Sequence, residues 1–330
     1  MSAVAAARPY LPGLGLLAVG ALLSHLVAGA VDGLQPLVVA VAIGALVGNT
    51  VGTPDAAEPG VGVDKLFLET GIVLLGAAVV VEEFLAAGPT VLGLVVATVA
   101  GGLLLAEGIA RGLFRLDGTT PSLLAAGASV CGVSAVVAIG RVLDSRGSAI
   151  TFAAATVLLF DAVTLVAFPA VGSVLGLPDR TFGIWAGLSL FSTGPTTAVG
   201  FAVSETAGQW ATVTKLVRNT LIGILAVAYA IYYSSGDRRT GAGAIWHQFP
   251  KFLVGFLIVA LVVNLGTVDG ATRAVLGRIS DWLFAFAFVG LGVELNPRRL
   301  RATGIRPLAV VLAQLLTVSL LALGAVRLLV

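Results

Sequence analysis

Long apolar runs fill the chain almost from end to end, and short segments of glycine, proline and charged residues separate them. A bilayer core about 30 Å thick requires roughly 20 apolar residues in each spanning helix. The pattern therefore predicts an all-α integral membrane protein, with about eleven transmembrane helices in one domain covering 1–330. The expected spans are residues 12–30, 36–50, 66–81, 90–110, 122–140, 150–171, 182–203, 212–233, 252–265, 279–295 and 307–329.

Composition supports this class, because 58% of the 330 residues are hydrophobic and only 11% are charged. A soluble domain is typically about a quarter charged. The single cysteine excludes an intrachain disulfide framework, and His25 and His247 are too few and too far apart for a recognisable metal motif. No nucleotide-binding motif such as a P-loop is present. We therefore expect no cofactor, no metal and no nucleic-acid partner.

Basic residues in the short loops predict the orientation, since cytoplasmic loops collect Lys and Arg. The loop "RRLRATGIR" at 298–306 carries the strongest such signal. The balance places the N-terminus in the cytoplasm and the C-terminus outside the plasma membrane. This orientation predicts seven basic residues on the outside, namely Arg141, Arg146, Lys215, Arg218, Arg273, Arg278 and Arg327.

A weak internal echo links "LETGIVLLGAAVVVEEFLAAGP" at 68–89 with "FAFAFVGLGVELNPRRLRATGIRP" at 284–307. Each has an apolar run, a small-residue pair and a Val-Glu step, followed by Gly and Pro. An odd number of spans separates the two copies, so they should lie in opposite orientations, as in an inverted-repeat transporter with halves of about 36–171 and 182–330. The alternative is a chance likeness between two apolar segments.

Two expected spans contain residues that disfavour a continuous helix. In "GASVCGVSAVVAIG" at 127–140, small residues either allow close helix packing or mark an interruption near 131–134. In "FSTGPTTAVGFAV" at 191–203, Gly194-Pro195 should break or kink the helix. Two interrupted, hydroxyl-rich spans favour a binding site at the bilayer midplane, built by two discontinuous helices.

A half-helix that begins inside the membrane offers free amides that suit an anion, and one that ends there offers carbonyls that suit a cation or a proton donor. Cys131 is expected mainly to pack, because nothing near it in sequence lowers its thiol pKa. The candidate substrate-binding residues are Ser129, Cys131, Gly132, Ser134, Thr193, Gly194, Thr196 and Thr197.

Three charged residues lie within or at the start of expected spans. Asp161 in "TVLLFDAVTLVAFP" should face a cavity or a partner, since a carboxylate at that depth is costly. It is either a protonatable coupling site or a structural hydrogen-bonding group. Lys215 and Arg218 share a helix face, and they could hold a substrate anion, pair with Glu205, or extend to the interface as snorkelling cations.

Several motifs resemble the YeiH family of prokaryotic membrane proteins, to which sulfate export is ascribed. They are "GIVLLGA" at 71–77, "GASVCGVSAV" at 127–136, "FGIWAGLS" at 182–189, "ATVTKLVRN" at 211–219 and "GLGVEL" at 290–295. The resemblance implies a multispanning plasma-membrane protein that exports sulfate or a related sulfur oxyanion. A more distant similarity to bile-acid:sodium-symporter-like folds implies inverted repeats and two broken helices that cross, at 127–134 and 192–200.

The chain departs from this family pattern in one place. Relatives commonly carry a His-Asp-Thr-type run with a Gln in the seventh span, whereas "FSTGPTTAVG" has no acid, imidazole or amide. Asp161 lies in the sixth span, where relatives usually have a small or apolar residue. Either the membrane carboxylate has moved to the adjacent helix, or this branch has another substrate or coupling ion.

These observations predict a secondary transporter of a small anion, sulfate or a sulfonate, driven by an ion gradient or by the gradient of the substrate. The alternatives are a passive anion channel and an intramembrane enzyme, although no histidine lies in a neighbouring span to serve as a base. The expected partners are a small inorganic or organic anion, a coupling proton or sodium ion and the lipid bilayer. The sequence leaves a homo-oligomer open.

Overall fold

The computed structural model describes residues 8–31, 35–52, 54–78, 81–233, 251–294 and 305–330. This part of the chain is helical, with turns and short links between the helices, and no strand occurs in it. The chain divides into two compact units, which are described separately below. Unit 1 contains Met1–Phe84 and Lys251–Pro297, and unit 2 contains Leu85–Pro250 and Arg298–Val330.

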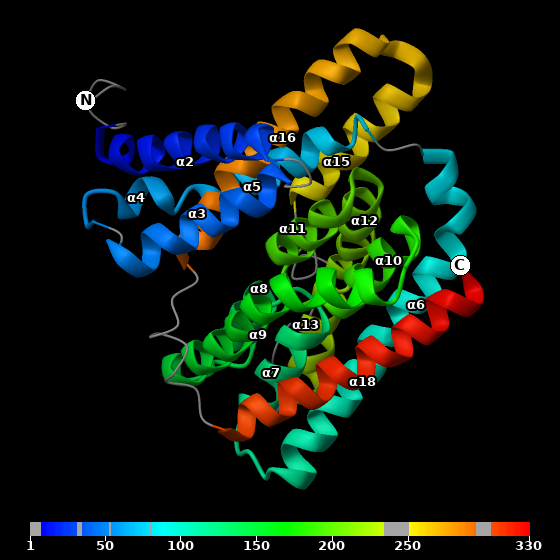
Figure 1. Ribbon diagram of the computed structural model, residues 1–330. Coiled ribbons are helices and arrows are strands. Elements are labelled where there is room, and N and C mark those ends of the chain that lie inside the picture. The colour runs from blue at the N-terminus through cyan, green and yellow to red at the C-terminus, as the bar shows by residue number, and fades with distance from the viewer. Residues whose placement is uncertain (1–7, 32–34, 53, 79–80, 234–250, 295–304) are drawn as a thin grey trace. The chain divides into compact units, whose positions relative to one another are not determined.

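Unit 1 is built around the long helix α16, which packs against α2, α3 and α5 (Figure 1). Glycines allow the close approach: a Cβ on Gly48 would meet the carbonyl oxygen of Val293 at 2.5 Å. The helices of this unit are η1 (Arg8–Tyr10), α2 (Leu11–Ala30), α3 (Pro36–Thr50), α4 (Glu58–Val61), α5 (Asp64–Leu75), α15 (Lys251–Val262), the π-helix η3 (Val263–Thr267) and α16 (Gly270–Glu294).

Helices α5 and α16, which hold parts of the two copies of the internal echo, pack against each other in unit 1 and run antiparallel. Ser280 Oγ donates to the Gly71 carbonyl at 2.8 Å, whereas Gly290, further along α16, lies against Asp64 at the start of α5. Asp64 and Ser280 lie outside the two copies, so these contacts do not test the opposite orientations expected of them. The inverted repeat stays a prediction, and the two units each take segments from both expected halves, 36–171 and 182–330.

In unit 2, two of the expected helices are each interrupted and form two half-helices. Here α12 lies alongside both α10 and α11, and α18 packs against α7, α9 and α10 (Figure 1). Its helices are α6 (Val81–Gly108, from Leu85 on), the π-helix η2 (Ile109–Leu113), α7 (Thr120–Ser129), α8 (Val133–Val142), α9 (Gly147–Val174), α10 (Asp179–Ser189), α11 (Thr193–Val203), α12 (Glu205–Thr220), α13 (Ile222–Tyr232) and α18 (Ile305–Leu329).

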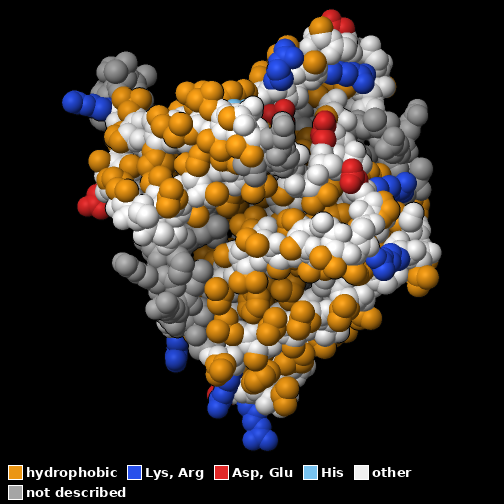
Figure 2. Space-filling model, in the orientation of Figure 1, with side chains coloured by type: hydrophobic (Ala, Val, Ile, Leu, Met, Phe, Trp, Pro, Cys, Tyr) orange, Lys and Arg blue, Asp and Glu red, His pale blue; other side chains and the backbone are white. Residues whose placement is uncertain are grey.

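Hydrophobic side chains cover much of the visible surface over α2 and over α18 (Figure 2). Leu22 and Leu26 of α2 and Leu320 and Leu321 of α18 are all exposed. Helices that satisfy their own backbone hydrogen bonds and expose apolar side chains are what a bilayer, rather than water, requires of the surface. The protein is therefore a helical membrane protein.

The eleven expected spans are not confirmed. By length and hydropathy, six helical segments of the described chain are candidates to cross a membrane. Helical interruptions explain two of the five missing spans, because expected spans 122–140 and 182–203 each divide into two half-helices of 10 or 11 residues. The other three, at 36–50, 66–81 and 252–265, fall on helices that are shorter than the 18 residues required of a candidate. The six candidates are Arg8–Ala30, Gly88–Leu113, Gly147–Val174, Glu205–Tyr232, Gly270–Glu294 and Ile305–Leu329.

Candidate functional site

The first helix interruption in unit 2 separates α7 from α8. Helix α7 ends at Ser129, and Gly132 adopts φ +66° and ψ −135° before α8 begins at Val133. This conformation is one that only glycine adopts without strain. A Cβ at this position would also collide with Ser192, which lies in the second interruption. Gly132 therefore both turns the chain and allows the two interruptions to touch.

The second interruption separates α10 from α11. Helix α10 ends at Ser189, and the backbone of Leu190 and Ser192 is extended. Helix α11 then begins at Thr193, so Pro195 lies in its first turn, where a missing amide hydrogen costs no helical hydrogen bond. The break predicted at Gly194-Pro195 is present, and it lies just before these residues.

Two cationic side chains of α12 donate hydrogen bonds to carbonyl oxygens at the C-terminal ends of α7 and α10. Lys215 Nζ donates to the carbonyls of Val130 at 2.7 Å and Leu190 at 2.8 Å. Arg218 donates to the Ser129 carbonyl at 2.6 Å and to Leu190 at 2.7 Å. Its other acceptors are the carbonyls of Ala128 at 2.8 Å, Leu188 at 2.8 Å and Gly187 at 3.3 Å.

These contacts correct three of the expectations for Lys215 and Arg218. Both residues lie in the interior of α12 and not in an outside loop, and they are 0% and 1% exposed, so neither is a snorkelling cation. Neither forms an ion pair with Glu205, whose Oε1 accepts instead from Gln209. The prediction that placed Lys215 and Arg218 near the membrane surface was wrong because it began the helix at residue 212, whereas α12 begins at Glu205.

Asp161 on α9 lies at the second interruption. It is 1% exposed, and its Oδ1 accepts the backbone amide of Ser192 at 3.1 Å. Its Oδ2 has no hydrogen-bond partner within the described residues. The carboxylate therefore caps the beginning of α11 from a neighbouring helix, which is a position that the partial positive charge of a helix N-terminus stabilises.

Four of the predicted site residues gather where α8 and α11 begin. Gly132 touches Ser192, Ser134 is exposed in the first turn of α8, and Thr193 and Gly194 are half-buried at the start of α11. The first amides of a helix have no partner inside that helix. This face therefore presents backbone amides and hydroxyl groups together, with Lys215 and Arg218 behind it.

The other predicted residues point into the interior. Ser129 Oγ accepts from Gln314 Nε2 at 2.9 Å, and Cys131 is a buried free thiol. Thr196 Oγ1 donates back to the Ser192 carbonyl at 2.7 Å, and Thr197 Oγ1 accepts from Thr212 at 3.1 Å. These four residues support the interruptions and do not open onto the face formed by α8 and α11.

Three residues of this site were absent from the predicted set. Ser192 joins the two interruptions, Asn219 Nδ2 donates to Thr193 Oγ1 at 2.9 Å, and Gln314 reaches Ser129 from α18. Gln314 is the one side-chain amide in the mostly apolar run 307–329, which could have marked it as a buried partner.

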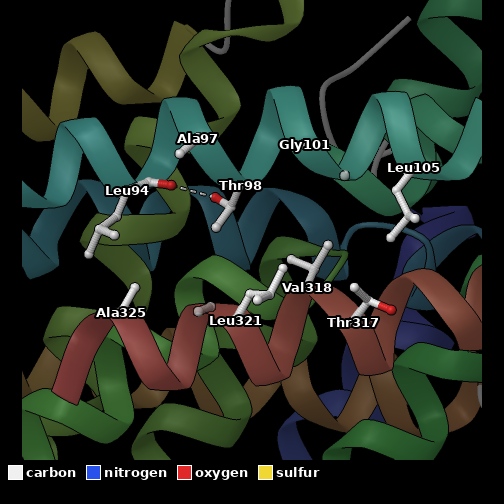
Figure 3. A pocket seen from close by; sticks show the side chains of 11 residues that line it. Leu94, Ala97, Thr98, Gly101, Leu105, Thr317, Val318, Leu321 and Ala325 are labelled. Carbon is white, nitrogen blue, oxygen red and sulfur yellow. Dashed lines mark hydrogen bonds between the residues drawn. The ribbon is translucent and has the colours of Figure 1, made fainter. Parts of the chain in front are cut away.

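A groove of about 330 Å³ between α6 and α18 is not part of this site. Its lining is apolar apart from the hydroxyls of Thr98 and Thr317 (Figure 3). Thr98 Oγ1 already donates to the Leu94 carbonyl within its own helix, at 2.8 Å. None of the predicted substrate-binding residues lines the groove. Within the described residues, no group of three or more metal-binding side chains occurs either.

Comparison with known proteins places the chain in a family. A family model described as conserved hypothetical protein 698 matches residues 12–311. A UPF0324 membrane protein of Nitratidesulfovibrio vulgaris is 31% identical over 281 residues, which are 79% of this chain and 48% of that protein. Another from Rhodopirellula baltica is 30% identical over 283 residues, which are 79% of this chain and 51% of that protein.

This chain spans about half the length of these two relatives. A third relative, a UPF0324 membrane protein of Corynebacterium glutamicum, is 29% identical over 319 residues, which cover 96% of this chain and 92% of that protein. No solved structure matches the chain. The match across 12–311 shows that the chain belongs to the YeiH-type family of UPF0324 membrane proteins, the family of conserved hypothetical protein 698.

Proposed function

We propose that this protein is a secondary transporter of a small anion, with sulfate or an organic sulfonate as substrate. The observation that carries the proposal is the face where α8 and α11 begin side by side, with Ser134, Ser192 and Thr193 on it. Backbone amides at a helix N-terminus bind oxyanions, and two such termini with adjacent hydroxyls offer a tetrahedral oxyanion several donors.

The charges behind this face favour the same class of ligand. Lys215 and Arg218 contribute two formal positive charges, and Asp161 contributes at most one negative charge. Both cations donate to main-chain carbonyls, and no carboxylate among the described residues forms an ion pair with them. Asp161 interacts electrostatically with both cations and offsets part of their charge, so a net positive charge remains behind the face.

Asp161 supplies a candidate coupling group. It lies on α9 and contacts the second interruption at Ser192, which agrees with a membrane carboxylate that has moved to the adjacent helix. Its unpartnered Oδ2 leaves room for a proton. We expect Asp161→Asn to transport with an altered pH dependence, and unchanged transport with unchanged pH dependence would contradict this role.

The remaining features of the proposed transporter are those predicted from the sequence. About eleven spans, an inverted repeat, a cytoplasmic N-terminus and an outside C-terminus in the plasma membrane remain part of the proposal. Alternating access would move one bundle against the other around the face formed by α8 and α11. Without a nucleotide-binding motif, an ion gradient or the substrate gradient supplies the energy.

The first test is ligand-dependent stabilisation of the purified full chain. Melting temperatures are measured with sulfate, sulfite, taurine and other sulfonates, with chloride as the reference anion. A true ligand raises the melting temperature with a saturable concentration dependence. Flux of the same anion into proteoliposomes then separates a transporter, which saturates, from a channel, which does not. The absence of any anion-dependent stabilisation and flux would refute the proposal.

A pair of isosteric variants locates the binding site. Thr193→Val removes a hydroxyl from the proposed face, and the loss of one hydrogen bond of about 1 kcal/mol should raise Kd about fivefold. Thr98→Val removes a hydroxyl that bonds only within α6, so its Kd should equal that of the wild type. Equal Kd values for the two variants would place the anion elsewhere.

A further inference from the structure

The ends of α7 and α10 have an unusual set of hydrogen-bond partners. The last carbonyls of a helix have no partner within it, and inside a membrane each one must be satisfied by another group. Ala126 and Gly127 accept the amides of Val130 and Gly132 in the usual way. Six further carbonyls, at positions 128, 129, 130, 187, 188 and 190, are bound by the two cations of α12.

This arrangement has the chemistry of a metal-cation site. Carbonyl oxygens at the C-terminal ends of broken helices are ligands that transporters use for a sodium ion. Here Lys215 Nζ lies 2.7 Å from the Val130 carbonyl and 2.8 Å from the Leu190 carbonyl, and so bridges the two interruptions. A compact ammonium with three donors can replace a bound monovalent cation at such a point.

We propose that Lys215, supported by Arg218, takes the place of a coupling metal ion between the two interruptions, so that the site needs no sodium. The cation is covalently part of α12 and cannot dissociate. The consequence for transport, that anion movement is independent of sodium, rests on the proposed function. The consequence for binding does not, because it concerns only the carbonyls of Val130 and Leu190.

Truncation of the tethered cation should create the metal site that it replaces. Lys215→Ala removes the ammonium and its fully buried stem, which leaves a space with the two carbonyls on its border. The Val130 carbonyl then loses its donor, while the Leu190 carbonyl keeps Arg218, and a polar space of this kind takes up an ion or water because an unpaired buried carbonyl is costly. We therefore expect Lys215→Ala to bind Na⁺, whereas the wild type does not.

The experiment compares melting temperatures in NaCl, KCl and choline chloride at constant ionic strength. Sodium at ten times its Kd should raise the melting temperature of Lys215→Ala by about 2–4 °C, with saturation. Lys215→Met fills the space without a charge and should show no response to sodium. Lys251→Ala removes an exposed lysine of α15 and serves as the matched control, with the same lack of response as the wild type.

Several results would overturn the proposal that Lys215 takes the place of a metal ion. Saturable stabilisation of the wild type by Na⁺ would overturn it, and so would a folded Lys215→Ala that does not respond to Na⁺. Where Lys215→Ala is too unstable to purify in choline chloride, its yield of monodisperse protein should recover when membranes are extracted in NaCl. Equal yields in the two salts would contradict the proposal.

A flux measurement separates this inference from the proposed function. Uptake of the anion that stabilises the protein is measured in proteoliposomes with and without a sodium gradient, and the two rates should agree. A sodium-dependent rate would overturn the inference and leave anion transport intact. A complete absence of anion flux, together with sodium binding by Lys215→Ala, would refute the proposed function and leave the inference intact.

Discussion

In unit 1 the glycines where α3 meets α16 lie inside continuous helices, whereas in unit 2 Gly132 lies between two half-helices. A Cβ on Gly292 of α16 would collide with the Val41 carbonyl of α3, and Gly44 of α3 faces Val289 of α16 in the same way. These residues let two backbones approach, as small residues do in membrane helix pairs. Gly132 instead allows a backbone conformation that ends one helix and begins another.

The difference shows that small residues alone do not decide between packing and interruption. A helix can be interrupted inside a membrane only where other groups satisfy the freed carbonyls and amides. Unit 2 supplies these groups from α12, with Lys215 and Arg218, and from α9, with Asp161. Close-packed helices such as α3 and α16 keep their own hydrogen bonds and need no such partners.

The largest expected effect comes from removing the arginine that supports both interruptions. Arg218→Ala leaves four carbonyls without a donor, while the Leu190 carbonyl keeps Lys215, and we expect a loss of about 4–5 kcal/mol in the free energy of unfolding. Unfolding in mixed detergent micelles measures it. Arg327→Ala on α18 is the matched control, because Arg327 is exposed and makes one bond of 3.3 Å to the Leu175 carbonyl. A similar small loss in both variants would show that the interruptions do not depend on α12.

The next effect concerns the backbone conformation at the first interruption. Gly132→Ala adds a methyl group at a positive φ and against Ser192, so we expect a loss of about 3 kcal/mol from strain and overpacking together. Gly101→Ala in α6 meets no atom within 4 Å and should be neutral or slightly stabilising. The measurement is again the free energy of unfolding in micelles. Wild-type stability for Gly132→Ala would show that the interruption is not fixed by glycine.

Substitution of a close-packed glycine in unit 1 should lower the stability less than substitution of Gly132. Gly292→Ala forces α16 and α3 apart, with an expected loss of about 2 kcal/mol, but it requires no unfavourable φ. Gly277→Ala lies on the same helix and meets no atom within 4 Å, so it should be neutral or stabilising by about 0.5–1 kcal/mol. Thermal shifts of the two variants in detergent check the difference. A loss for Gly292→Ala larger than that for Gly132→Ala would reverse the comparison between the units.

Sequence patterns predicted the class of the fold and the two interruptions, because hydropathy and the cost of Gly and Pro in a helix are local properties. They also marked Asp161, since a carboxylate in an apolar run is costly wherever it lies. The partners of Lys215 and Arg218 could not be predicted in this way. Main-chain carbonyls are present at every residue and leave no signal in the sequence.

Long-range partners were missed for a related reason. Gln314 donates a hydrogen bond to Ser129, which lies 185 positions away in the chain, and no local sequence pattern links the two residues. The eleven expected spans stay unconfirmed in part because two half-helices look like one apolar run. Hydropathy measures the polarity of side chains, whereas an interruption is a property of backbone hydrogen bonds.

The smallest expected effect compares two carboxylates that cap helices in different ways. Asp269 in unit 1 lies outside the candidate spans, and its Oδ1 accepts the Thr272 amide at 2.7 Å, so it caps its own helix α16. Asp161 in unit 2 caps α11 from another helix and is buried. The hydrogen bonds from Thr272 lower the pKa of Asp269 below 3.8.

A lowered pKa in the folded state stabilises the fold above pH 3.8, and this contribution is lost as the pH falls through the folded pKa. Asp269→Asn keeps an acceptor for the Thr272 amide but cannot titrate. We expect it to melt slightly earlier than the wild type at pH 6, and this difference should shrink as the pH falls through the folded pKa of Asp269. A difference of equal size at all pH values would show that the cap acts through its geometry, and that its charge contributes nothing at this exposed helix end.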